Sequence, residues 1–134
     1  MRAVLDPNVL ISALLSPTGV PAALLMRWLG GEFELVVSAL LLAELDRALA
    51  YPKLRSRIAD DEAQAFIDLL RRTATMADDP AAPARRSRDP GDDYLLALAE
   101  SAVAILVTGD QDLLDVKDLP VRSPRAFLEK MSAQ

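Results

Sequence analysis

The sequence contains no cysteine and no histidine among its 134 residues. Their absence excludes a disulfide, a zinc site built from these residues, a Ser-His-Asp or Cys-His nucleophile and an imidazole general base. Any catalysis by this chain must therefore use carboxylates, hydroxyls, Lys and Arg, or a bound metal ion.

Long hydrophobic runs are also missing, although hydrophobic residues make up 51% of the chain. Runs such as residues 39–43 are far too short to cross a bilayer, which needs about 20 apolar residues. Asp6 interrupts the apolar segment at the N-terminus, and no small-residue cleavage pattern follows it. We therefore expect a cytoplasmic protein with no membrane partner.

The chain lacks an excess of basic residues, and its formal net charge is −5. This argues weakly against an ordinary basic nucleic-acid binder, because Lys and Arg supply most of the affinity for phosphate. Divalent cations held in an acidic pocket would reverse the local charge.

The length of 134 residues predicts one domain that spans residues 1–134. Short apolar strands alternate with amphipathic helices, which favours a three-layer α/β/α domain with a central parallel sheet. The expected strands cover residues 3–5, 33–37, 73–76, 104–107 and 120–122, and the expected helices cover residues 7–14, 21–29, 39–50, 60–72, 92–99, a short segment up to 114, and 124–131.

Acidic residues follow several of these strands. Asp6 and Asp110 come directly after strands, an acid pair opens the helix at residues 92–99, and Glu44 lies about two turns into the helix that follows the second strand. Parallel strands present their carboxyl ends at one edge of the sheet, so these acids are expected to converge there. Trp28 and Phe33 are expected in the core.

Taken singly, each acid is explained as well by a helix cap or a solvated position, with Ser38 as a further cap. Taken together, the acids favour metal binding, because clustered like charges need a cation or a proton to neutralise them. Hard carboxylate oxygens without His or Cys select Mg²⁺ or Mn²⁺. One or two such ions would activate a water for attack on a phosphodiester.

The segment 77–91 is rich in proline and polar residues and is predicted to be a long loop. It carries Arg85, Arg86 and Arg88 shortly before the acid pair. These arginines either contact phosphate groups of a nucleic acid or lie in a solvated loop without a role.

Four segments resemble the PIN-domain nuclease family, including the VapC-like toxins of type II toxin–antitoxin pairs: residues 4–13, 38–45 around Glu44, 89–99 around Asp93, and 106–114 around Asp110. By this resemblance Asp6, Glu44, Asp93 and Asp110 form the acidic metal-binding and catalytic set. Asn8, Ser38 and Thr108 match small polar residues beside it, and Asp92 and Asp112 are supporting residues that compete with Asp93 and Asp110 for these places.

The resemblance implies cleavage of single-stranded RNA that depends on Mg²⁺ or Mn²⁺, one or two ions per site. It also implies a cognate antitoxin protein as partner and a homodimer.

Three alternatives remain open. A haloacid-dehalogenase-like phosphatase also places an Asp after its first strand, but its second Asp is replaced here by Asn8, and no well-placed Lys precedes residues 108–110. The others are a non-catalytic PIN-like module that binds RNA or protein, and a DNA-acting nuclease of related fold.

Overall fold

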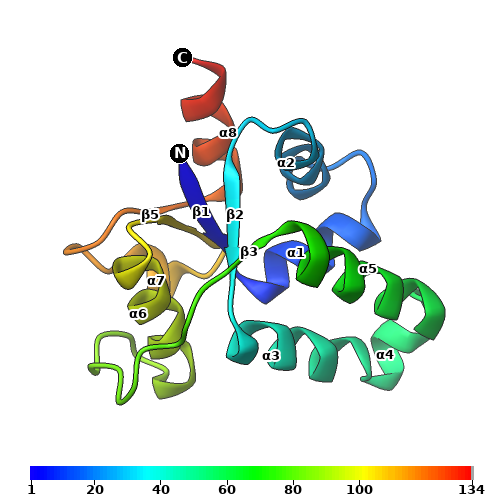
Figure 1. The fold of residues 1–134 in the computed structure, drawn as a ribbon, viewed down its shortest axis with the longest axis horizontal. Helices are drawn as coiled ribbons and strands as arrows, with labels where there is room; N and C mark the ends of the chain where they lie inside the picture. The colour runs from blue at the N-terminus through cyan, green and yellow to red at the C-terminus, as the bar shows by residue number, and fades with distance from the viewer. Residues whose placement is uncertain (134) are drawn as a thin grey trace.

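The computed structural model describes residues 1–133 and contains five short strands among its helices (Figure 1). The strands are β1 (Arg2–Leu5), β2 (Glu34–Val37), β3 (Thr75–Met76), β4 (Ile105–Val107) and β5 (Val121–Arg122). The helices are α1 (Pro7–Leu15), α2 (Val20–Leu29), α3 (Ala39–Leu49), α4 (Pro52–Arg55), α5 (Asp60–Thr73), α6 (Asp93–Ser101), α7 (Gln111–Leu114) and α8 (Pro124–Ser132), with a 3₁₀ turn, η1, at Pro90–Asp92.

All strand pairs are parallel, and the strand order is β3-β2-β1-β4-β5. Strand β1 is central: Leu5 pairs with Val107 of β4, and Ala3 pairs with both Leu35 of β2 and Ile105 of β4. The chain first builds the sheet outward from β1 through β2 and β3, and then returns to the other side of β1. Such a reversal opens a crevice at the carboxyl ends of the strands, which in this chain are the positions before Asp6 and Thr108.

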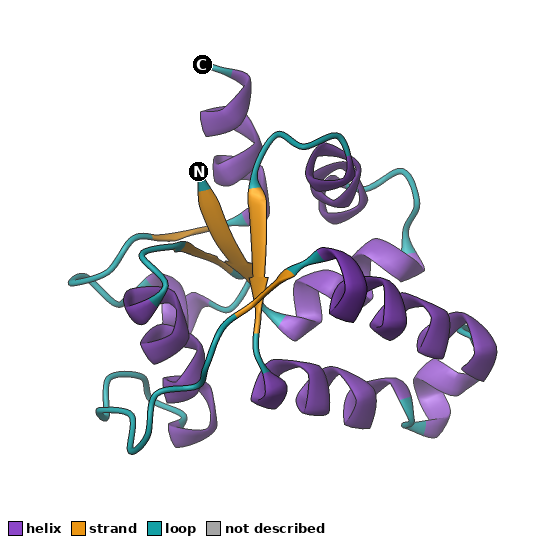
Figure 2. Ribbon diagram, viewed as in Figure 1, coloured by secondary structure: helices purple, strands orange, loops and turns teal. Residues whose placement is uncertain are grey.

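Helices cover both faces of the sheet (Figure 2). Helices α1 to α5 lie on one side, and α6 and α7 lie on the other, as right-handed crossovers require when the strand order reverses. Helix α8 packs against α2 and β5. The predicted three-layer α/β/α fold with a parallel sheet is thus confirmed.

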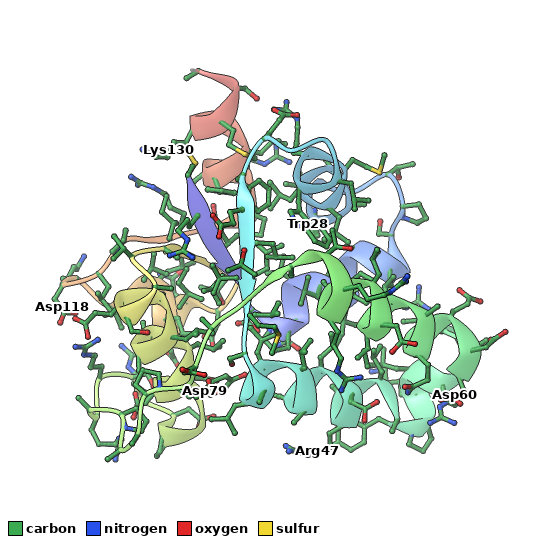
Figure 3. All side chains as sticks on the ribbon, in the orientation of Figure 1. Trp28, Arg47, Asp60, Asp79, Asp118 and Lys130 are labelled. Atoms are coloured by element: carbon green, nitrogen blue, oxygen red, sulfur yellow. The ribbon has the colours of Figure 1, made fainter. Side chains whose placement is uncertain are left out.

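The central strands are buried on both faces, since Val4, Leu5, Val36 and Val37 are at most 1% exposed. Trp28 lies between α2 and the sheet, as Figure 3 shows, so its predicted place in the core is confirmed. Phe33 is also in the core, where its ring meets that of Phe127 edge to face at 5.2 Å.

Two local elements differ from the sequence-based expectation. Helix α4 is not among the helices expected from the sequence, and Pro52 occupies its first turn, where the missing N–H costs nothing. Helix α5 extends to Thr73, so β3 is shorter than expected and begins at Thr75.

In the described chain, no single helix is both long and apolar enough to cross a membrane. Helices α1 and α2 reach that length and composition only when taken together, and they are bent by 100° relative to each other.

Candidate active site

A cavity of about 340 Å³ opens at the carboxyl ends of β1 and β4, where the strand order reverses. Asp6, Asn8, Gly109 and Asp110 line it from the two strand ends. Its other walls come from the helices, through Val9, Ser12, Pro21 and Pro124. The cavity therefore lies where parallel α/β proteins commonly bind ligands.

Asp6 is held in this cavity from two directions. It caps α1, accepting the backbone N–H of Asn8 on Oδ1 at 3.0 Å, while Oδ2 accepts the hydroxyl of Thr108 at 2.7 Å. Burial raises its pKa, the hydrogen bonds from Asn8 and Thr108 lower it, and the charge of Asp110 raises it further, with a net rise. The helix-cap interpretation of Asp6 therefore does not exclude a functional one, because the same residue caps α1 and lines the cavity.

After β4, as after β1, an acid caps the helix that follows the strand. Thr108 is fully buried, and its hydroxyl oxygen also accepts the backbone N–H of Asp110 at 3.0 Å. Asp110 caps α7 through one oxygen, which accepts the backbone N–H of Asp112 at 2.9 Å. Asp112 supports Asp110 with its backbone, whereas its side chain pairs with Arg88.

The third acid, Glu44, lies on α3 and is half-buried. Its Oε2 accepts a short hydrogen bond from the hydroxyl of Tyr94 on α6. Burial, followed by the hydrogen bond to Glu44 and its charge, raises the pKa of Tyr94, so the phenol stays protonated and acts as the donor. Ser38 at the start of α3 is buried and accepts the N–H of Leu41 at 3.2 Å, so its predicted role as a helix cap is confirmed.

Asp92 is the member of the acid pair whose pKa is raised by the charges of the other carboxylates. Burial and then the negative charges of Asp89, Asp6, Asp110 and Glu44 raise the pKa of Asp92 to about 6. Although Asp92 stands at the N-cap of α6, its side chain makes no capping hydrogen bond. The carboxylate of Asp92 is therefore not held at the helix end.

Asp93 has entirely different surroundings. Its Oδ1 accepts the backbone N–H of Arg86 at 3.1 Å and both the N–H and the hydroxyl of Ser87, at 2.8 and 2.9 Å. Its Oδ2 accepts Arg85 Nε at 3.0 Å, and the side chain is 2% exposed. Burial raises the pKa of Asp93, but the hydrogen bonds from Ser87 and Arg86 and the charge of Arg85 outweigh this effect and lower it.

The sequence-based preference is for Asp93 over Asp92, and in the structure both oxygens of Asp93 are engaged by residues 85–87. The two residues are neighbours at a helix start, so their side chains point about 100° apart, and only one can face the sheet edge. Asp93 is bound by the N–H groups of the loop before η1, whereas the charges of the other acids raise the pKa of Asp92.

The three loop arginines are all ion-paired within the chain. Arg85 pairs with Asp93, and Arg88 pairs with Asp112 at 2.5 Å and with Asp115 at 3.6 Å. Both keep most of their surface in solvent, at 65% and 72% exposure. Arg86 is only 22% exposed and pairs with Glu100 and Asp118, away from the acids around Asp6.

Within residues 1–133, no three carboxylates lie close enough to enclose a cation as they stand. The donor set nevertheless suits a divalent cation, because the acids are hard oxygen ligands whose charges raise one another's proton affinity.

Three polar side chains near the site were not singled out from the sequence. The only indication of Tyr94 in the sequence is its position directly after the acid pair. Ser87 is buried beneath Asp93. Asp79 accepts the N–H of Leu40 at the start of α3 at 3.0 Å, and Figure 3 shows it between α6 and α3.

A parallel three-layer fold with acids gathered at the carboxyl ends of its central strands defines the class of the protein. The sequence matches the family model described as PIN domain over residues 2–112. The chain therefore belongs to the PIN-domain family, whose members are nucleases that generally use divalent metal ions.

The chain is also similar to other proteins over nearly its whole length. The uncharacterized protein MJ1680 of Methanocaldococcus jannaschii is 27% identical over 141 residues, which cover 97% of this chain and 91% of the relative. The structure of PAE2754 from Pyrobaculum aerophilum superimposes with a TM-score of 0.69 at 19% identity, covering 100% of this chain and 91% of that one. VapBC2 from Rickettsia felis, bound to a DNA fragment from their promoter, gives a TM-score of 0.66 at 16% identity, covering 92% of this chain and 98% of that one.

Proposed function

We propose that the protein is a metal-dependent endoribonuclease that cleaves single-stranded RNA and acts as the toxin of a toxin–antitoxin pair. The observation that carries the proposal is that Asp6 and Asp110 line one cavity at the carboxyl ends of β1 and β4, where buried Thr108 hydrogen-bonds to both residues. The negative charges of Asp6, Asp110 and Glu44 also contribute to the raised pKa of Asp92, and a bound cation would offset the repulsion among these carboxylates.

Asp6, Glu44, Asp92 and Asp110 would hold one or two Mg²⁺ or Mn²⁺ ions. When bound, such an ion lowers the pKa of a water nucleophile and stabilises charge on the phosphodiester oxygens. Thr108 fixes Asp6 through its hydroxyl and Asp110 through its oxygen, so one buried side chain orients two acids. The backbone N–H of Asp112 directs one oxygen of Asp110 toward α7.

Arg85 and Arg88 are the proposed contacts for RNA phosphates, because their guanidinium groups are mostly exposed at the loop that leads to Asp92. The carboxylate partners of Arg88 hold it weakly, since exposed ion pairs contribute about 0–1 kcal/mol. Phosphate oxygens can therefore replace Asp112 beside Arg88. Arg86 is not part of this set because its partners draw it away from the acids.

A cognate antitoxin is the proposed protein partner, and a homodimer is the proposed assembly. Support for the antitoxin comes from the likeness to the VapBC2 toxin–antitoxin complex over 98% of the matched chain. An acidic cavity with exposed arginines beside it gives such a partner charges of both signs to recognise.

The test is cleavage of labelled single-stranded RNA, single-stranded DNA and a phosphatase substrate by the purified protein, with Mn²⁺, Mg²⁺ or a chelator. We expect cleavage of the RNA alone and only with a divalent ion, and we expect Asp6→Asn to abolish it without unfolding the protein. Cleavage in chelator would overturn the metal mechanism. Turnover of the phosphatase substrate or of DNA would establish an alternative, and no cleavage of any substrate would indicate a binding module.

A further inference from the structure

The contact between Tyr94 and Glu44 links two helices that flank the acid cluster. Tyr94 is the second residue of α6 and Glu44 is the sixth residue of α3, so 50 positions separate them in the chain. Among the described residues, theirs is the one hydrogen bond that joins α3 to α6. Figure 1 shows these helices approaching the carboxyl edge of the sheet from its opposite faces.

We propose that Tyr94 is a positioning residue that holds Glu44 in place for the divalent ion, an inference that rests on the proposed function. Tyr94 occupies Oε2 of Glu44 and leaves Oε1 without a protein donor among the described residues. A free Glu side chain has three rotatable bonds, so fixing it in one rotamer costs conformational entropy. The hydrogen bond from the hydroxyl of Tyr94 fixes the Glu44 side chain before the ion binds.

A second feature suits Tyr94 to this role. The hydroxyl is a neutral donor, so it fixes a carboxylate without cancelling its negative charge, as Lys or Arg would. The other acids show the same design, since Asp6 is oriented by a hydroxyl and a backbone N–H, and Asp110 by a backbone N–H. The cluster therefore keeps its full charge for a cation.

The experiment measures Mn²⁺ binding by titration calorimetry, with no RNA present, for the wild-type protein and for Tyr94→Phe. The variant keeps the aromatic ring and loses only the hydroxyl, so we expect Mn²⁺ to bind about tenfold more weakly, the scale of one hydrogen bond to a charged group. Tyr51→Phe is the matched control, because Tyr51 is 61% exposed and its side chain makes no capping bond. We expect this control to bind as the wild type does.

A double-mutant cycle with Glu44→Ala separates positioning from a general structural effect. If Tyr94 acts through Glu44, Tyr94→Phe has no further effect on Mn²⁺ affinity once Glu44 is replaced. An equal loss in both backgrounds, or no loss in Tyr94→Phe, would overturn the inference while leaving the nuclease proposal intact. Failure of the wild-type protein itself to bind Mn²⁺ would overturn the proposed function and this inference with it.

Discussion

Replacing Asp92 and Asp93 one at a time by Asn should change stability in opposite directions. The pKa of Asp92 is raised from 3.8 to about 6, so the folded state disfavours its ionised form. Two pKa units correspond to about 3 kcal/mol for a fully desolvated group, and half-exposure reduces this to about 1 kcal/mol. Asp92→Asn should therefore raise the free energy of unfolding at pH 7.5 by about 1 kcal/mol in metal-free buffer.

Asp93→Asn should have the opposite effect. An amide oxygen can keep the three bonds from Arg86 and Ser87, but the amide nitrogen would then face the guanidinium of Arg85. Loss of one charge-assisted bond costs about 2 kcal/mol. Asp93→Ala, which loses all four bonds, should cost about 3–5 kcal/mol.

The two effects also differ in their pH dependence. Because the folded pKa of Asp92 is raised, its destabilising charge is absent below about pH 4 and fully present above about pH 6, so the gain in Asp92→Asn should vanish in acid. Because the folded pKa of Asp93 is lowered, its contribution is present above the unfolded pKa of about 4 and is lost only as the pH falls further.

Urea unfolding at pH 4, 6 and 7.5 in chelator measures the stability of each variant. Mn²⁺ titration and RNA cleavage then measure its metal binding and its activity. We expect Asp92→Asn to lose Mn²⁺ binding and cleavage, and Asp93→Asn to keep both while it unfolds at lower urea. A folded Asp93→Asn that binds no Mn²⁺, or an Asp92→Asn that is less stable than the wild type at pH 7.5, would refute the assignment of the two acids.

Three further predictions concern single positions. Val103 has a φ of 53° and is 85% exposed, so Val103→Gly should stabilise the protein by about 1 kcal/mol in thermal unfolding without affecting cleavage. Ser38→Ala should cost about 1 kcal/mol in urea unfolding, because the N–H of Leu41 loses its cap. Arg88→Ala should raise the KM for RNA several-fold and leave kcat nearly unchanged, whereas Arg86→Ala should leave KM unchanged, and equal effects on KM would contradict the different placement of the two arginines.

Local sequence signals predicted the fold because they agree with the tertiary structure. The apolar run before Asp6 and the Pro after it define the end of β1 and the start of α1, and Ser38 marks the start of α3 in the same way. Asp6 and Asp110 could be located from the sequence because a residue between a strand and a helix lies at the sheet edge in any parallel α/β fold.

The choice between Asp92 and Asp93 could not be made from the sequence. It depends on where the first turn of α6 begins, and that point is set by η1 and by the N–H groups of Arg86 and Ser87. The partners of Arg88 on α7 and of Tyr94 on α3 are 24 and 50 residues away, so no local pattern reveals them.

The adjacent acids have opposite effects on the folded state: Asp93 stabilises it, and Asp92 destabilises it. Asp93 collects four hydrogen bonds from residues 85–87 and so anchors the turn that carries Asp92. Asp92 is thereby held among negative charges that a free side chain would avoid. A bound cation would remove that repulsion, so metal binding should stabilise the fold most when both acids are present. In this view, the buried and structural Asp93 matters to the site because it holds its neighbour in a position that is unfavourable without the ion.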